Sequence, residues 1–360
     1  MILVIWRKCR KKIIPISLTE QPTISIIISA YNEENIIEEK IQNLKSLHYD
    51  KNRIEFLIGS DGSTDKTAEI LKEHQSKNLI VYISNKRRGK PAILNELVQM
   101  AHGEIIVFSD ANTLYQQDTI KNLVHHFSDP KVGAVCGRLV LESTDNVSQF
   151  TGEISYWEYE NTIKKLESDI HSAIGANGAV YAIRRSLYKQ LPTDIPVVDD
   201  LMIPLYIVEK GYVVKYEPNA LAFEKITGTV AGEFKRKIRI GVANYYGLFE
   251  FLKLLHPRFG FVAFALISHK ILRWFIPFFL IAIFISSFIL AFESQFFLLL
   301  LLIEVIFIFI AIFGYFSESF KWQIGILGYP FYFIAMNTAL FIGFLKFIRR
   351  EKQPTWDVVR

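Results

Sequence analysis

The first part of the chain alternates short apolar runs with longer amphipathic stretches. Several apolar runs are rich in Ile, Val and Phe and have the length of buried strands. They are Ile24–Ser29, Ile54–Gly59, Leu79–Ile83 and Ile105–Phe108. The stretches that follow them space their apolar residues as a helix face does. They are Glu34–Leu47, Thr64–His74, Lys90–His102 and Asp118–Phe127. This alternation predicts an α/β fold with a mostly parallel sheet covered by helices on both faces.

The alternation becomes less regular further along the chain. Val132–Gly137 and Val180–Ile183 are two more strand candidates. Phe150–Leu166 is predicted to be an aromatic amphipathic helix, and a helix is also expected over Asp199–Lys210. The basic amphipathic stretch Val230–Phe251 predicts a helix that lies on a membrane surface.

The chain is 51% apolar, and most of the excess lies in its last third. Three stretches there have few charges and about the length needed to cross a bilayer. They are Trp274–Phe292, Phe296–Phe316 and Gln323–Phe347. Buried helices of a soluble core would need amphipathic partners, and none stands between these stretches. We therefore predict an integral membrane protein.

Basic residues predict the orientation of the chain in the membrane. Lys253, Arg258, Lys270 and Arg273 precede the first apolar stretch, and the loop 293–295 after it has no basic residue. Because basic loops stay on the cytoplasmic side, the N-terminal region is expected in the cytoplasm. Three crossings would place the basic C-terminal tail outside, so either one stretch lies in the interface or the rule does not hold here.

The N-terminus and the overall charge point to lipid as a partner. The apolar start MILVIW is followed by a basic run, which is the wrong order for a secretory signal and indicates an interfacial anchor or the stump of a longer helix. The net charge of +5 then indicates contact with anionic lipid, and no nucleic acid is expected as a partner. Cys9 and Cys136 are too isolated for a disulfide framework or a zinc site.

Polar residues follow several predicted strands at the points where they end. Tyr31 and Glu33 follow the first strand, Asp61 follows the second, and Asp110 and Asn112 follow the fourth. Ligands of parallel α/β sheets bind at the carboxyl ends of the strands. The sequence therefore predicts one binding site at this edge of the sheet.

Asp110 and Asn112 are candidate metal ligands. A hard cation such as Mg²⁺ takes one or two carboxylates together with phosphate and water oxygens. The alternative is a helix cap, because Asp and Asn before a helix satisfy its free N–H groups. The other polar strand ends favour the metal.

The segment SDGSTDKT follows the second strand and suits a tight turn before a helix. Asp65 is interpreted as a cap of that helix. Asp61 lies closer to the strand end, where its carboxylate can accept hydrogen bonds from a nucleobase or a ribose. We therefore predict that Asp61 binds a nucleotide.

A basic turn precedes the predicted helix that begins at Lys90. Arg88 and Lys90 flank Gly89, and cations on a glycine turn at a helix N-terminus are suited to a diphosphate. Lys86 and Arg87 are interpreted as a solvated loop.

Asp199 and Asp200 precede an apolar helix. One acid is enough to cap a helix, so the pair indicates a second role. A general base must lie within hydrogen-bond reach of the proton that it removes. Asp200 is the candidate base for an acceptor hydroxyl, while a metal at Asp110 would hold a leaving phosphate.

Taken in order, these stretches resemble glycosyltransferase family 2, specifically its membrane-bound members of the cellulose, hyaluronan and poly-N-acetylglucosamine synthase type. The similar motifs are SAYNEE, SDGSTDKT, RRGKPAILN, FSDAN, GANGAVYAIRR and VVDDL, and the match covers roughly residues 24–240. The resemblance implies a GT-A fold (a Rossmann-like, mostly parallel sheet), a UDP-sugar donor and an inverting transfer that makes a β-linkage. It also implies a bacterial or archaeal cell membrane and partner subunits of a polysaccharide export system.

The resemblance assigns roles to residues that match the family motifs. Tyr31, Glu33 and Asp61 would face the uridine, and Lys90 would lie near the base or the diphosphate. Asp110 matches the first acid of Asp-x-Asp, which binds Mg²⁺ or Mn²⁺, and Asp200 matches the catalytic base. Further residues are expected at the donor, acceptor or sugar sites, namely Arg88, Arg239, Asn177, Gly178 and Asp199.

This sequence also departs from the family pattern. Asn112 stands where many relatives have a second Asp, and Asp199 replaces the Glu of Thr-Glu-Asp. Processive synthases carry Gln-x-x-Arg-Trp, and here Arg236 and Ile240 replace the Gln and the Trp while Arg239 keeps the Arg. Because the Trp would form part of the acceptor site, its loss favours transfer of a single sugar over polymerisation.

The expected domain organisation follows from these patterns. Residues 1–22 would form a basic N-terminal anchor, 23–228 a cytoplasmic GT-A domain and 229–258 an amphipathic interfacial region. Residues 259–347 would form a transmembrane region with about three segments, and 348–360 a basic tail.

Two functions are weighed. The first is a metal-dependent inverting glycosyltransferase that acts on a saccharide or lipid-linked acceptor in exopolysaccharide or glycolipid synthesis. The second is a catalytically silent membrane subunit that binds nucleotide or a partner glycosyltransferase. The presence of Asp61, Asp110 and Asp200 together favours the enzyme.

Overall fold

The computed structural model describes residues 21–142, 151–225, 230–319 and 328–352. The predicted N-terminal anchor, apart from residues 21 and 22, lies outside the described residues, as do residues 353–360 of the predicted tail. The predicted domain limits therefore stay predictions.

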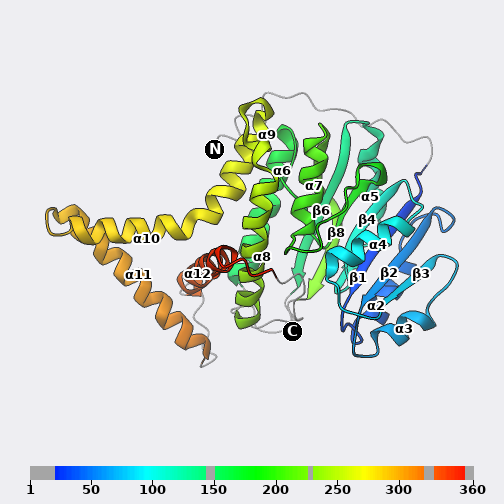
Figure 1. Cartoon of the computed structure of the whole chain (residues 1–360), viewed down its shortest axis with the longest axis horizontal. Coiled ribbons are helices and arrows are strands. Elements are labelled where there is room, and N and C mark those ends of the chain that lie inside the picture. Colours follow the sequence, from blue (N-terminus) through cyan, green and yellow to red (C-terminus); the bar gives the residue numbers. More distant parts are fainter. Residues whose placement is uncertain (1–20, 143–150, 226–229, 320–327, 353–360) are drawn as a thin grey trace.

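A mixed eight-stranded sheet forms the centre of the fold, with the order β3-β2-β1-β4-β7-β6-β8-β5 (Figure 1). Its strands are β1 (Ile24–Ala30), β2 (Ile54–Asp61), β3 (Leu79–Ser84), β4 (Ile105–Asp110), β5 (Thr113–Tyr115), β6 (Val132–Glu142), β7 (Tyr181–Arg184) and β8 (Val213–Lys225). The first four strands to be predicted are parallel neighbours, and β7 runs antiparallel to both β4 and β6. Ser29 pairs with Asp110, so the carboxyl ends of β1 and β4 lie side by side.

Helices cover both faces of the sheet, as the alternating pattern predicts. One face carries α2 (Ile37–Lys45), α3 (Thr67–Glu73) and α5 (Thr119–Val124), and the other carries α4 (Lys90–Met100) and α7 (Asp199–Glu209). Successive residues of β1 alternate between two hydrophobic cores, because side chains of a strand point to opposite faces. Ile26 and Ile28 belong to the core under α2, α3 and α5, and Ile27 belongs to the core under α4 and α7.

Two strands were not predicted from the sequence, β5 and β8. β5 has only three residues. β8 contains Pro218 and Asn219, which are typical of a turn. The register between β6 and β8 shifts beside these residues, so the strand forms a bulge there and then continues.

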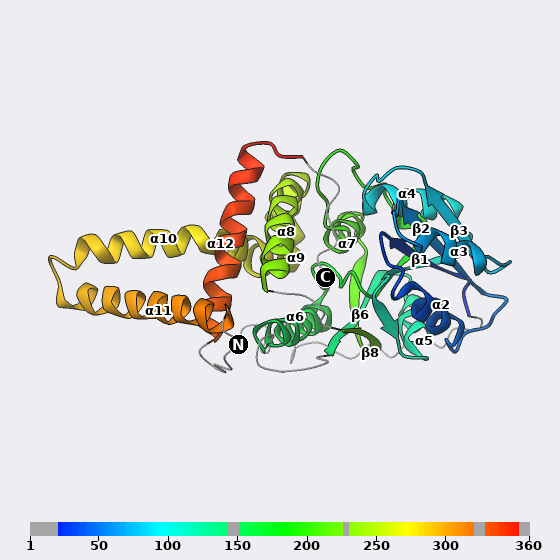
Figure 2. The same cartoon turned by 90° about the horizontal axis from the view of Figure 1, so that it is seen from below.

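Three helices of the described chain are long and apolar enough to cross a membrane, over Phe261–Leu290, Gln295–Phe316 and Gly328–Ile348. The first contains α9 (Phe261–Ala265), a π-helical segment (Leu266–Ile271) and α10 (Leu272–Leu290). α10 and α11 (Gln295–Ser319) form a hairpin that projects away from the sheet (Figure 1 and Figure 2). Only 6% of the most apolar stretch of α11 is buried inside the protein. Its side chains therefore face outward, as they would toward lipid.

Two more long helices join the sheet to these apolar helices. α6 (Thr151–Ile170) packs on β6 and β8, and α8 (Val230–Glu250) lies beside α12 (Gly328–Ile348) (Figure 2). A β-carbon on Gly343 of α12 would lie 2.9 Å from the carbonyl oxygen of Ile238 in α8. Glycine at this position therefore lets the two helix backbones approach closely.

Candidate active site

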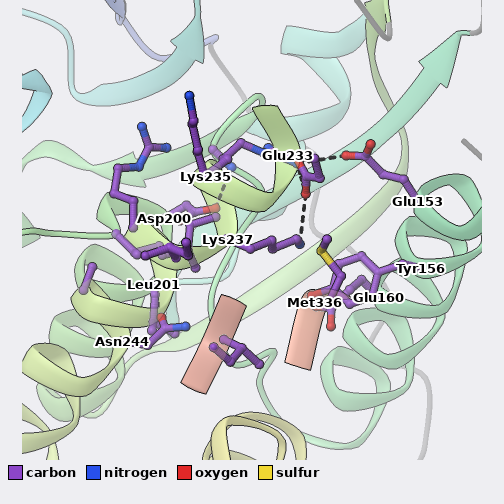
Figure 3. A pocket seen from close by; sticks show the side chains of 18 of the residues that line it. Glu153, Tyr156, Glu160, Asp200, Leu201, Glu233, Lys235, Lys237, Asn244 and Met336 are labelled. Carbon is purple, nitrogen blue, oxygen red and sulfur yellow. Dashed lines mark hydrogen bonds and ion pairs between the residues drawn. The ribbon is translucent and has the colours of Figure 1, made fainter. Parts of the chain in front are cut away.

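A cavity of about 2090 Å³ opens at the carboxyl ends of the parallel strands. Tyr31, Asp61 and Asp110 contribute to its wall at this end. The cavity continues between α6, α8 and α12, where Figure 3 shows side chains that include Glu153 and Met336. The site predicted from the strand ends is therefore continuous with a space that reaches the candidate membrane helices.

Asp61 ties the end of β2 to the basic turn before α4. Its carboxylate accepts hydrogen bonds from the backbone N–H groups of Arg88 (2.6 Å) and Gly89 (2.8 Å). Gly62 has a φ of +67°, and a β-carbon there would lie 2.6 Å from the backbone nitrogen of Arg87. Glycine is needed at this close approach, and the carboxylate fixes the turn at the cavity wall.

The basic turn presents a different arginine from the one that was predicted. The guanidinium of Arg88 donates to the Tyr82 hydroxyl (3.1 Å) and to Glu96 (3.0 Å). The sequence favours a solvated loop at Arg87, but the guanidinium carbon of Arg87 lies 3.7 Å from the ring centre of Tyr31. Of these two arginines in the described chain, Arg87 lines the cavity, together with Tyr31 and Glu33.

Lys90 connects two acids for which the sequence predicts separate roles. Its ammonium lies 2.8 Å from Oδ1 of Asp110 and 3.1 Å from Oδ1 of Asp199. Burial disfavours ionisation of Asp110, but the Lys90 ammonium outweighs it and holds the pKa of Asp110 below its ordinary value. All three side chains line the cavity, so Asp110 presents an ionised carboxylate there.

A buried lysine forms hydrogen bonds to residues on both sides of Asp110. Lys40 of α2 is fully buried, and its ammonium donates to the Ser109 hydroxyl (2.7 Å) and the Thr113 carbonyl (2.5 Å). Burial lowers the pKa of Lys40 to about 7, although Asp110 opposes this shift. The turn that carries Asp110 leads into strand β5, so Asp110 and Asn112 do not cap a helix.

Oxygen donors around this turn fit a hard divalent cation. Asp110 offers a carboxylate, and Asn112 offers an amide oxygen while its nitrogen donates to Glu224 (2.8 Å). Burial, together with the nearby charge of Asp110, raises the pKa of Glu224 to about 7. Asp110, Asn112 and Glu224 all line the cavity.

Asp200 and Asp110 both approach Gly178. The backbone N–H of Gly178 donates to Oδ2 of Asp200 at 2.9 Å. A β-carbon on Gly178 would lie 3.5 Å from Oδ2 of Asp110 and 3.5 Å from Oδ2 of Asp200. Burial, with a contribution from Asp199, raises the pKa of Asp200 to about 6. A carboxylate with this pKa is suited to accept a proton near neutral pH.

Asn177, the neighbour of this glycine, does not line the cavity. Its side chain is fully buried, donates to the Gly137 carbonyl (2.8 Å) and accepts a hydrogen bond from Lys164. Lys164 also donates to the Ala176 carbonyl at 2.9 Å. Asn177 therefore holds the loop that carries Gly178.

α8 brings two arginines to the cavity from the membrane side. Burial and the nearby charge of Arg236 together lower the pKa of Arg239 to about 10. Arg236 is paired with Glu233 (2.5 Å) and with Glu153 of α6 (2.8 Å). Arg239, which matches the arginine of the family motif, therefore lies at the same cavity as Asp110 and Asp200.

Several residues of the cavity wall are not recognisable as site residues from the sequence. They are Glu153, Glu160, Lys164, Glu224 and Glu233. The three on α6 are charged residues inside an amphipathic helix, a pattern that ordinarily indicates a solvated face. Glu224 lies on β8, which was not predicted.

A second group of metal-type ligands lies outside this cavity. Single ligand atoms of His125, His126 and Glu217 are all within 4.8 Å of one another, and His126 contacts Glu217 at 2.7 Å. None of the three lines the cavity in the described part of the chain, so we assign them no part in the site.

Comparison with known proteins agrees with these motifs. Residues 25–191 match the family model of glycosyl transferase family 2. Poly-β-1,6-N-acetyl-D-glucosamine synthase of Staphylococcus aureus (strain MSSA476) is 28% identical over 232 residues, which are 62% of this chain and 55% of that protein. The Staphylococcus epidermidis enzyme of that name is 29% identical over 60% of this chain and 53% of its own length. The chain thus spans about half the length of these curated relatives.

A solved structure resembles the chain over nearly its whole length. It is a mannosyltransferase from Pyrobaculum calidifontis in complex with GDP-mannose and Mn²⁺, with a TM-score of 0.72 and 22% sequence identity. The likeness covers 97% of this chain and 93% of that protein. It supports the GT-A fold and extends to the apolar C-terminal helices.

Proposed function

We propose, for a chain that carries a glycosyl transferase family 2 domain, that it is an inverting membrane glycosyltransferase. It moves a sugar from a UDP-sugar to a saccharide or lipid-linked acceptor, in exopolysaccharide or glycolipid synthesis. The family match over residues 25–191 and the poly-N-acetylglucosamine synthase relatives support this reaction class. The basic residues before the first apolar helix support a cytoplasmic catalytic domain.

The donor nucleotide would bind at the ends of β1 and β2. Tyr31, Glu33 and Asp61 are the proposed contacts of the uridine, and the geometry of the cavity adds Arg87 to them. Lys90 and Arg239 would contact the diphosphate, because cations balance its charge as the sugar departs. Arg88 contributes its backbone N–H to the turn and directs its side chain elsewhere.

Asp110 and Asn112 would hold Mg²⁺ or Mn²⁺. When bound, the metal would neutralise negative charge on the diphosphate. Lys90 holds Asp110 ionised and oriented toward the cavity.

Asp200 is the proposed catalytic base. It would take the proton of an acceptor hydroxyl while that oxygen forms a bond to the anomeric carbon. The bond between this carbon and the diphosphate oxygen breaks, and the nucleotide leaves with the electron pair. Attack from the face opposite the leaving group inverts the anomeric centre. Gly178 holds Asp200 through its backbone N–H, and Asp199 supports the site through Lys90.

One observation carries the proposal most directly. Oδ2 of Asp110 and Oδ2 of Asp200 approach the same point beside Gly178, in a cavity that reaches both the strand ends and the membrane helices. The leaving diphosphate would then lie near Asp110 and the acceptor hydroxyl near Asp200, with the transferred sugar between them.

The test is nucleotide release by the purified full chain in detergent. UDP-sugars and GDP-mannose are supplied in turn with Mg²⁺ or Mn²⁺, and Asp110→Asn and Asp200→Asn are compared with the surface variant Lys189→Gln. We expect turnover with one donor, lost in both aspartate variants and kept in the control. Nucleotide binding without turnover on any donor, with membranes supplied as the source of acceptor, would instead favour a silent subunit.

A further inference from the structure

Three cations form one wall of the cavity near the candidate membrane helices. Lys164 extends from α6, and Lys270 and Arg273 come from the first apolar helix. All three line the cavity, together with Ala176 and Gly178 from the loop that holds Asp200. Positive charge therefore lies on the acceptor side of the proposed base.

A single carboxylate balances much of this charge. Glu160 is paired with Lys270 at 3.2 Å and also with Arg273. Lys164 donates only to uncharged oxygens of the Ala176–Asn177 loop among the residues described. Behind this wall, His269 lies between Glu160 (3.2 Å) and Glu167 (2.7 Å). Of these charged residues, Lys164, Lys270, Arg273 and Glu160 line the cavity, whereas His269 and Glu167 do not in the described part of the chain.

This excess of cations is costly unless an anion is bound. Lys164 is 2% exposed and Glu160 is 3% exposed, so water screens their charges poorly. A phosphate oxygen accepts charge-assisted hydrogen bonds from both lysine and arginine. The geometry at Arg273 suits this use, because its guanidinium lies 5.7 Å and 5.5 Å from the ring centres of Tyr156 and Tyr159, which hold it at the wall.

The part of the cavity next to these cations is apolar. Its lining residues there come from α10, α11 and α12, and they include Ile276, Phe307, Ile310, Phe333, Met336 and Leu340. These helices also present apolar side chains outward, as lipid-facing helices do. A ligand that fits this region would carry an anionic group beside an apolar chain.

We propose that Lys164, Lys270 and Arg273 bind the phosphate of a lipid-linked acceptor, whose apolar chain lies between α10, α11 and α12. The inference rests on the proposed function, because it names the acceptor class for the same cavity. The phosphate then places the acceptor hydroxyl toward Asp200. A neutral saccharide chain would use neither the excess of cations nor the apolar wall.

Binding of farnesyl phosphate tests this proposal without requiring transfer. Its affinity for the full chain in detergent is measured beside those of farnesol and inorganic phosphate. We expect farnesyl phosphate to bind about 10- to 100-fold more tightly than either, because both a charge-assisted contact and an apolar contact are needed. Equal binding of farnesol would overturn the role of the cations, and equal binding of inorganic phosphate would overturn the role of the apolar wall.

Variants at the wall make the test specific. Arg273→Gln should weaken farnesyl phosphate about tenfold or more without changing the affinity for farnesol, and Arg273→Lys should restore most of the loss. Lys253→Gln, which removes the same charge outside the cavity, should change neither affinity. Unchanged binding of farnesyl phosphate in Arg273→Gln would contradict the site.

The transfer assay separates this inference from the proposed function. If farnesyl phosphate binds as expected while no nucleotide sugar is ever turned over, the proposed function fails and the lipid phosphate site stands. If sugar passes to a short neutral N-acetylglucosamine oligosaccharide and farnesyl phosphate neither binds nor competes, the enzyme stands and the acceptor is a polysaccharide.

Discussion

The ammonium nitrogen of Lys90 lies 2.8 Å from Asp110 and 3.1 Å from Asp199, so one lysine links the proposed metal ligand to the acid beside the proposed base. The three groups depend on one another electrostatically, because loss of the Lys90 ammonium would leave the carboxylates of Asp110 and Asp199 without this shared positive charge. Lys90 therefore joins the end of β4 to the start of α7.

Lys90→Met should lower the free energy of unfolding by about 1–3 kcal/mol, because two carboxylates lose a charged hydrogen-bond partner. Mn²⁺ should then stabilise the variant more than the parent protein, because the metal supplies positive charge where the ammonium is missing. Thermal unfolding in detergent with and without Mn²⁺ measures both effects. Lys189→Met, which removes a surface lysine paired with Glu250 at 3.1 Å, is the control. Equal stabilisation of all three proteins by Mn²⁺ would contradict this account.

Asp200 should set the acidic limb of the pH profile. Its pKa is about 6 in the folded protein, above its ordinary value of 3.8, so kcat/KM should rise with pH and level off above about 6 as the base becomes ionised. A raised acid pKa means that the folded state binds the proton more tightly than the unfolded state does. The stability from this group is therefore present at low pH and is lost as pH rises from about 4 to about 6.

Asp200→Asn removes both effects. The variant should be inactive, yet more stable than the parent at pH 8 by about 1–3 kcal/mol, because no buried carboxylate has to ionise. Thermal unfolding of both proteins between pH 5 and pH 8 gives the comparison. The same pH dependence of stability in the two proteins would show that Asp200 does not titrate in this range.

Gly178→Ala should separate activity from folding. The added methyl group meets Oδ2 of Asp110 and of Asp200 at 3.5 Å, which is an ordinary contact, so stability should change by no more than about 0.5 kcal/mol. The methyl group would occupy the space between the two acids, and transfer should fall by about 100-fold or more. Gly247→Ala is the matched control, because its β-carbon has no neighbour within 4 Å in the described structure. Full activity of Gly178→Ala would exclude this space from the reaction.

The orientation of the chain can be tested by cysteine labelling. Ser294 lies in the connection between α10 and α11, and Lys189 is half exposed on the catalytic domain. In a Cys9→Ser background, Ser294→Cys should react with a membrane-impermeant maleimide in intact cells, and Lys189→Cys should react only after permeabilisation. The reverse pattern would place the catalytic domain outside.

Much of the parallel half of the sheet could be predicted, because β1, β2 and β3 are each followed by a helix and both patterns are local. The strands predicted at Ile24, Ile54, Leu79 and Ile105 begin at these residues in the structure. β8 was missed because Pro218 and Asn219 are typical of a turn, and only the pairing with β6 shows that the strand bulges and continues.

The candidate site was predicted best where strand ends define it. Asp61, Asp110 and Asp200 all line one cavity. The sequence did not tell which of Arg87 and Arg88 faces that cavity, because a loop has no period from which side-chain direction follows. Lys164 was missed for another reason. A charged residue in an amphipathic helix is ordinarily solvated, and only the structure shows that Lys164 is buried and donates to the Ala176 carbonyl.

The close contact between α8 and α12 has a consequence for the synthesis of the protein. α12 is the last helix described along the chain, and its residues line the cavity together with residues of α6 and α8. A ribosome therefore finishes the catalytic domain well before the partner helix of α8 emerges. The nascent chain has to deliver its apolar hairpin to the insertion machinery before Gly343 can reach Ile238. If the chain acts as proposed, newly made protein would acquire its transferase activity only after these helices have entered the bilayer.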